Sequence, residues 1–199
     1  MSTDATALDA LPVGAVGERS VGWWGMLCLI ATEAALFAYL LFSYFYTYVQ
    51  QGRAWSPQPH PPIALAAANT LVLLASSGSA AWADRAERRG ARTPAITALA
   101  LTILLGSLFA IVQVFEWRAK PFTLTSGSYG SLYFTITGFH MAHVLAGIVM
   151  LGVILVWTAL GYFDRRRHLP LSIGVVYWHF VDAVWLFVFA SFYLLPRLW

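Results

Sequence analysis

The chain has 199 residues, of which 59% are hydrophobic and only 11% are charged. A typical soluble domain has about 25% charged residues, so the composition excludes a disordered chain and an ordinary soluble enzyme. The formal net charge of +3 argues against nucleic-acid binding. The single cysteine, Cys28, excludes a disulfide framework and a cysteine-rich zinc site.

Five long apolar segments predict an all-α fold, an integral membrane bundle of five transmembrane helices. A bilayer core about 30 Å thick requires roughly 20 apolar residues per helix, and backbone polar groups in lipid must be satisfied within the helix itself. We therefore expect residues 1–20 to form a flexible N-terminal tail and residues 21–199 to form one transmembrane domain. Its helices are predicted at 21–49, 63–83, 94–115, 131–160 and 173–195.

The basic residues predict how the bundle is oriented. Eight arginines fall in the N-terminal tail and in the loops 84–93 and 161–172, whereas four basic residues fall on the opposite side. Short loops rich in lysine and arginine stay on the cytoplasmic side of a membrane. We therefore expect a multi-pass protein of a bacterial inner membrane, with a cytoplasmic N-terminus and a periplasmic C-terminus.

The first three predicted helices carry few polar side chains. Glu33 lies near the middle of the first helix, where a charged side chain costs about 2.5–3.5 kcal/mol and usually faces the bundle interior. The second helix has a stripe of small residues, Ala75, Ser79 and Ala83, of the kind that lets helix backbones approach closely. The polar segment 116–130 after the third helix is expected to lie along the membrane surface.

The fourth and fifth helices each carry a pair of titratable side chains three residues apart. His140 and His143 share nearly one face of the fourth helix, and His179 and Asp182 have the same relation on the fifth. A second small-residue stripe runs beside the histidine pair. Either stripe serves packing within the chain or against a partner subunit, and the sequence does not separate the two. The second stripe comprises Gly138, Ala142 and Ala146.

These polar residues admit three interpretations. The three histidines with a carboxylate form a set that could bind zinc, iron or copper, which accept imidazole and carboxylate ligands. Interhelical hydrogen bonds between the fourth and fifth helices explain the same residues without a metal, and a lone His-x-x-His pair favours this second interpretation. The third is a proton relay. No continuous chain of polar residues crosses the membrane, so proton buffering at a subunit boundary is the form of it that we expect.

Five segments of the sequence resemble the cytochrome c oxidase subunit III family. Residues 138–147, G-F-H-M-A-H-V-L-A-G, are similar to the family signature G-F-H-x-x-H-V-x-x-G. Residues 177–187, Y-W-H-F-V-D-A-V-W-L-F, resemble its last helix. Five matches in order are more specific than any one motif, and the chain resembles the five-helix form of the family. The other matching segments are 25–37, which contains Glu33, 69–77 and 116–131.

The resemblance implies a non-redox core subunit of a haem-copper terminal oxidase, the cytochrome c oxidase of aerobic respiration. Such a chain packs on subunit I in a hetero-oligomer with subunits I and II, binds phospholipid, and supports proton uptake and stability during oxygen reduction. The resemblance also implies no catalytic residue and no metal in this chain, with haem and copper in the partner subunits. The family's buried polar set, structural or linked to lipid and protons, is Glu33, His140, His143, His179 and Asp182.

The number of histidines agrees with a subunit that carries no redox centre. A haem-copper catalytic subunit needs histidine ligands for two haems and a copper ion, more than the three histidines in the predicted membrane region. Two alternatives remain: a subunit III homologue of a quinol oxidase or nitric oxide reductase complex, and a stand-alone proton channel or transporter. Many transporters contain inverted repeats with interrupted helices, and neither feature is visible in the sequence.

Overall fold

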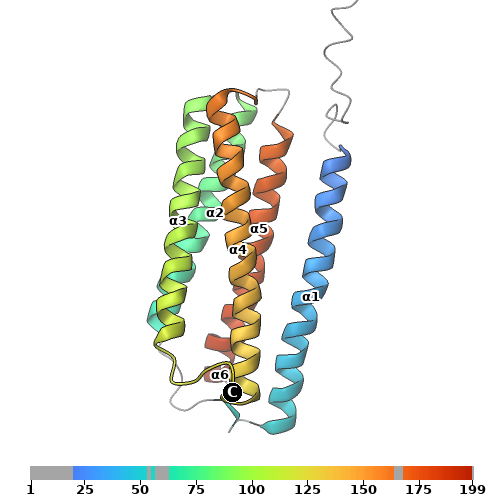
Figure 1. Ribbon diagram of the computed structural model, residues 1–199, viewed down its shortest axis with the longest axis vertical. Coiled ribbons are helices and arrows are strands. Elements are labelled where there is room, and N and C mark those ends of the chain that lie inside the picture. Colours follow the sequence, from blue (N-terminus) through green and yellow to red (C-terminus); the bar gives the residue numbers. More distant parts are fainter. Residues whose placement is uncertain (1–19, 53–54, 57–62, 164–167, 199) are drawn as a thin grey trace, which may run out of the picture.

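The computed structural model describes residues 20–52, 55–56, 63–163 and 168–198, and within these ranges it is all-helical (Figure 1). Five spans are long and apolar enough to cross a membrane, which confirms the predicted number. The predicted tail 1–20, apart from Ser20, lies outside the described residues. The elements are α1 (Val21–Gln51), α2 (Ile63–Arg88), α3 (Arg92–Arg118), α4 (Ser128–Leu160), α5 (Leu169–Phe189), η2 (Ala190–Leu194) and α6 (Leu195–Leu198), the last three forming one span.

Each span reaches or passes the ends of the apolar run that predicted it. α2 continues to Arg88, although its apolar run ends at residue 83, and α4 begins at Ser128 rather than at residue 131. The apolar run marks the part of a helix that lies in lipid, whereas the added turns carry polar side chains suited to the membrane surface. Basic side chains in the last turn of α2, Arg85 and Arg88, also interact favourably with the helix C-terminus.

α2, α3, α4 and α5 form a bundle, and α1 stands at its side (Figure 1). α1 packs mainly against α4 and α5. Only 6% of the residues in its most apolar stretch are buried, against 56% in the span that begins with α5. α5 is therefore the central helix of the bundle, whereas most of the α1 surface is left to lipid or to a partner.

Trp178 of α5 lies where three other helices converge. Its indole is fully buried and donates a hydrogen bond from Nε1 to Ser76 Oγ of α2 at 3.0 Å. The ring fits because glycines face it from two helices: a Cβ at Gly106 of α3 would lie 2.7 Å from the indole, and one at Gly147 of α4 would lie 2.8 Å away. The two glycines thus allow α3 and α4 to close around α5.

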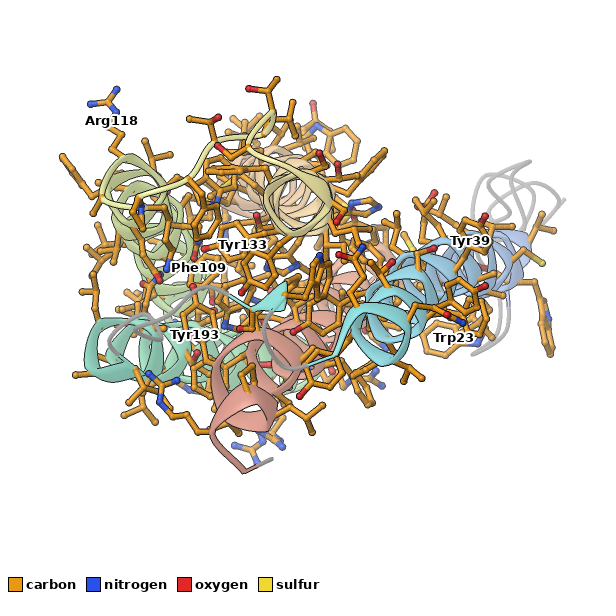
Figure 2. All side chains as sticks on the ribbon, turned by 90° about the horizontal axis from the view of Figure 1, so that it is seen from below. Trp23, Tyr39, Phe109, Arg118, Tyr133 and Tyr193 are labelled. Carbon is orange, nitrogen blue, oxygen red and sulfur yellow. The ribbon has the colours of Figure 1, made fainter. Side chains whose placement is uncertain are left out.

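A π-helix, η2, interrupts the last span. Its wide turn is closed by a hydrogen bond from the Leu195 N–H to the Ala190 carbonyl, five residues earlier. Phe192 and Tyr193 within this turn are buried. Figure 2 shows Tyr193 directed toward the interior of the bundle, on the same side as Tyr133 of α4. The π-helix therefore supplies two aromatic side chains to the core at this end.

Tyr44 joins α1 to this π-helix. The side chain is 1% exposed, and its hydroxyl donates a hydrogen bond to the Ser191 carbonyl at 3.2 Å. The Tyr44 ring lies against Phe192, with centroids 4.5 Å apart, and Trp55 packs beside it at 5.5 Å. These contacts fix the C-terminal half of α1 to the bundle.

Candidate functional site

Glu33 of α1 and His143 of α4 meet across the interface between the two helices. Glu33 Oε2 lies 3.0 Å from His143 Nε2, and His143 Nδ1 donates to the Phe139 carbonyl at 2.7 Å. Phe37 packs edge-on against the imidazole, with centroids 5.1 Å apart. The Glu33 side chain is 27% exposed and that of His143 is 14% exposed. The pair therefore lies at the surface of this chain rather than in its core.

The geometry of the Glu33–His143 pair indicates how many protons the imidazole and the carboxyl group carry together. A backbone carbonyl can only accept a hydrogen bond, so His143 Nδ1 carries a hydrogen. A second proton must lie between Nε2 and the Glu33 carboxylate, because two acceptors at this distance would repel each other. The pair then exists as imidazolium with carboxylate or as neutral imidazole with carboxylic acid. Both forms carry no net charge, which lowers the cost of placing Glu33 within a membrane span.

His140 lies in a different environment from His143. It is 1% exposed, stacks on Trp185 with centroids 4.9 Å apart, and meets the edge of Phe109 at 5.9 Å. Neither of its ring nitrogens has a hydrogen-bond partner. Although the spacing places the two histidines on neighbouring faces of α4, His140 faces the core and His143 faces α1. The two histidines thus form no joint site.

His179 and Asp182 of α5 converge on Ser77 of α2. His179 Nδ1 lies 2.5 Å from Ser77 Oγ. The Asp182 carboxyl group, which is 4% exposed, faces the same hydroxyl, but neither of its oxygens makes a hydrogen bond of ordinary geometry. The spacing of three residues on α5 correctly predicted that the two side chains share a face. The serine that lies between them was not singled out from the sequence.

Two adjoining pockets lie between α1, α2 and α5, at the end of the bundle that bears Arg85, Arg88 and Arg92, here called the arginine end. The first pocket, of about 240 Å³, is lined by polar side chains of α2 together with His179. The second, of about 480 Å³, is lined by Trp23, Trp24, Leu27, Arg88, His168, Leu169 and Ser172. Asp84 and Ser172 hold Arg88 in place, since the arginine lies 2.8 Å from Asp84 and 3.1 Å from Ser172.

The intramembrane histidines lie in three separate environments, and their arrangement favours interhelical contacts over a shared metal site. His143 pairs with Glu33, His179 with Ser77, and His140 packs between aromatic rings. Within the described ranges, no three His, Cys, Asp or Glu side chains gather closely enough to hold a metal ion. The contacts of His143 and His179 each join two helices, but they join α4 to α1 and α5 to α2. The predicted pairing of the fourth helix with the fifth through these side chains is therefore wrong.

Comparison with known proteins identifies the family. Residues 18–196 match the family model described as cytochrome c oxidase subunit III. The chain belongs to this family. It is 38% identical over 177 residues to cytochrome c oxidase subunit 3 of Formosania lacustris and of Pongo abelii, which covers 85% of this chain and 68% of each relative. To the same subunit of Locusta migratoria it is 35% identical over 177 residues, which covers 85% of this chain and 67% of the relative.

Membership of the subunit III family confirms the resemblance drawn from the five sequence segments. The family model matches most of the chain, from before α1 to the last turn of the final span. The roles assigned to Glu33, His140, His143, His179 and Asp182 stay predictions, as does the sidedness of the two termini. What the structure adds is which of these residues touch one another.

A polar network lies at the end of the bundle opposite the arginine end, and sequence reasoning missed it. Lys120 Nζ lies 2.8 Å from Glu116 Oε1, and both side chains are 5% exposed. Tyr193 donates to the same Glu116 oxygen at 2.5 Å, and the hydroxyls of Tyr133 and Tyr193 are 3.0 Å apart. The Lys120 ammonium also lies about 5 Å from the centres of both tyrosine rings. This network ties α3, α4 and η2 together.

The expectation that segment 116–130 lies along the membrane surface is wrong at its two ends. Glu116 is still within α3 and is buried, and Tyr129 and Gly130 are buried in the first turn of α4. A carboxylate and an amine four residues apart are a recognised helix pair, so the Glu116–Lys120 spacing held a usable signal. The polarity of the segment concealed it, because polar residues are normally assigned to water.

The small-residue stripes divide between the inside and the outside of the chain. Ser79 is buried and bonds to Thr102 of α3 at 2.7 Å, and Ala83 is buried nearby. Ala75 of the same stripe is exposed. In α4 the stripe faces outward: Gly138 has no atom near its would-be Cβ, and Ala142 and Ala146 are exposed. Packing of the exposed positions against a partner stays a prediction.

Proposed function

We propose that this chain is the non-redox core subunit III of a cytochrome c oxidase in a bacterial inner membrane. In that role it packs on subunit I beside subunit II, binds phospholipid, and supports proton uptake and stability during oxygen reduction. The match of residues 18–196 to the subunit III family is the observation that carries the proposal. The relatives compared above come from animals, so the bacterial membrane and the cytoplasmic N-terminus belong to the proposal and rest on the sequence.

The proposal assigns haem and copper to the partner subunits and none to this chain. Its support is the way the three intramembrane histidines are used. His143 is engaged by Glu33 and His179 by Ser77, while His140 is enclosed by Phe109 and Trp185. Among the described residues, no three metal-binding side chains gather closely enough to hold one ion, whereas a haem-copper centre requires several histidine ligands.

The arginine end offers the features that a phospholipid headgroup requires. Arg88 lines both pockets, and its guanidinium can bind a phosphate through two parallel hydrogen bonds. Trp23 and Trp24 line the larger pocket, and tryptophan favours the headgroup level of a bilayer. The exposed apolar face of α1 leads away from these pockets and suits acyl chains. These contacts support a bound phospholipid between α1, α2 and α5.

Affinity purification from native membranes tests the proposed function. The tagged full chain, extracted in a mild detergent, is expected to bring down an oxidase subunit I and a subunit II, with haem absorption bands in the preparation. An unrelated tagged multi-pass protein from the same membranes is the control. A subunit II with a copper site supports the cytochrome c branch, and one without it identifies the quinol-oxidase alternative. A colourless chain without partners contradicts the proposal and favours the stand-alone channel.

A further inference from the structure

The smaller pocket at the arginine end brings a titratable side chain of the bundle interior into contact with the surface. His179 lines this pocket together with Asp84, Arg85 and Arg88 of α2. Trp23 from α1 and Ser172, Val175 and Val176 from α5 complete the lining without adding charge. The charged groups that line the pocket with His179 are thus one carboxylate and two guanidinium groups, all from α2. A pocket of this size with several polar side chains has the room and the hydrogen-bond partners that water requires, so the His179 ring can exchange protons there.

Two further polar side chains, Ser77 and Asp182, lie beside His179 within the protein. Nδ1 of the ring is occupied by Ser77 Oγ at 2.5 Å, which leaves Nε2 as the nitrogen available to the pocket. The Asp182 carboxyl group, which is 4% exposed, faces the same Ser77 hydroxyl. Packing alone accounts for the Ser77–His179 contact, because those two groups satisfy each other. It does not account for a second, buried carboxyl group aimed at the same hydroxyl with both oxygens unpartnered.

We propose that Asp182, Ser77 and His179 form a proton-holding branch that opens to the pocket at the arginine end, with Asp182 as the group that holds the proton. The proposal deepens the proposed support of proton uptake and rests on it. The branch ends at Asp182, so it stores and returns protons at one surface and does not conduct them across the membrane. It thus gives a location within this chain to the proton buffering expected from the sequence.

The loaded and unloaded states differ by one proton and in the direction of the hydrogen bonds along the branch. In the loaded state the Asp182 carboxylic acid donates to Ser77 Oγ, and the Ser77 hydroxyl donates to His179 Nδ1, whose ring carries its hydrogen on Nε2. On unloading, the acid proton passes to Ser77 while the serine proton passes to Nδ1, and Nε2 releases its hydrogen to pocket water. Asp182 is then a carboxylate that accepts from Ser77, and His179 is neutral with its hydrogen on Nδ1. One proton leaves, and serine is unchanged.

Infrared difference spectroscopy of the purified complex in lipid tests the branch. Acid–base difference spectra should contain the carbonyl stretching band of a protonated carboxylic acid, and this band should be lost in Asp182→Asn. Asp84→Asn removes a carboxylate at the rim of the same pocket and should leave the band in place. Should Asp182→Asn fail to assemble, the wild-type chain labelled with ¹³C at aspartate carboxyl groups gives the same information, because a band that does not shift on labelling contradicts the proposal.

The serine supplies the second readout. In Ser77→Ala the band should persist, because Asp182 is still present, but its exchange with heavy water should be slower than in the wild type. Ser79→Ala removes another buried α2 hydroxyl, one that bonds to Thr102, and should exchange at the wild-type rate. Wild-type exchange in Ser77→Ala overturns the branch. Because each measurement uses chain that has co-purified with its partners, a missing band defeats the branch alone, whereas failure to co-purify defeats the proposed function.

Discussion

Glu33 and His143 are 110 residues apart in the sequence, and Glu33 Oε2 lies 3.0 Å from His143 Nε2. A carboxylate on the lipid-exposed helix would be costly by itself, and the imidazole on α4 removes that cost by keeping the pair neutral. The contact also fastens α1 to the bundle at mid-height, where few other side chains of α1 are buried. The pair thus holds α1 and α4 together, in addition to containing two titratable side chains.

A double-mutant cycle measures this contact. Glu33→Gln and His143→Gln are each expected to destabilise the chain, and their combination by less than the sum, with a coupling energy of about 0.5–3 kcal/mol. The measurement is unfolding in mixed detergent micelles. Thr32→Val combined with His143→Gln is the matched control, since Thr32 bonds within its own helix to Leu29 and should add without coupling. Additive energies for Glu33 and His143 would show that the pair contributes nothing.

Sequence reasoning at the residue scale found the polar side chains but only some of their neighbours. The spacing within one helix predicted that His179 and Asp182 share a face, which is correct. It gave no means to connect Glu33 with His143 or His179 with Ser77, because those contacts depend on how helices are rotated and placed against one another. Glu116 and Lys120 were readable as a helix pair, yet their burial depends on Tyr193, which the π-helix directs inward.

At the scale of elements, α3 and α4 pack closely against the Trp178 ring of α5. Because Gly106 and Gly147 have no side chain, they leave room for the indole, and a larger residue at either position would fill that room. Each glycine is therefore required by its neighbour rather than by its own backbone, whose φ is ordinary for a helix. A substitution here tests interhelical packing directly.

Gly106→Ala is expected to destabilise the bundle by about 1–3 kcal/mol, since the added methyl group would lie 2.7 Å from the Trp178 ring and would force the helices apart. Denaturation followed by tryptophan fluorescence measures the change. Gly152→Ala, on α4 with open space around its would-be Cβ, is the control. It should be neutral or stabilising by up to about 1 kcal/mol, because alanine favours a helix more than glycine does. Equal effects at the two positions would contradict the packing argument.

At the scale of the whole molecule, the spans and their order followed from hydropathy alone. Each helix had an apolar run near the length that a bilayer needs, so number and approximate position were predictable. The placement of α1 at the side of the bundle was not, because every run is apolar enough to be buried or to face lipid. The π-helix was also beyond prediction, since hydropathy does not distinguish it from the α-helix that it interrupts.

The position of α1 leaves pockets at the arginine end, and these predict a lipid contact. Arg88→Leu removes the guanidinium that lines both pockets and is expected to lower the amount of anionic phospholipid retained by the purified complex. Native mass spectrometry of the complex measures retained lipid. Arg118→Leu is the control, because Arg118 lies at the other end of the molecule and points away from the bundle (Figure 2). Unchanged lipid in Arg88→Leu, with normal assembly, would place the lipid elsewhere.

The π-helix at Ala190–Leu194 also affects α1, a helix that lies far before it in the sequence. Its wide turn holds one more residue than an α-helical turn, so removing one residue would restore the ordinary pitch with little rotation of the residues beyond. The Ser191 carbonyl, which accepts from the phenol of Tyr44, and the Phe192 ring, which packs on Tyr44, both lie in this turn and would be displaced. A deletion of one residue near the C-terminus would thus weaken the contact of Tyr44 with the π-helix. It would loosen the attachment of α1, more than a hundred positions away, to the rest of the subunit.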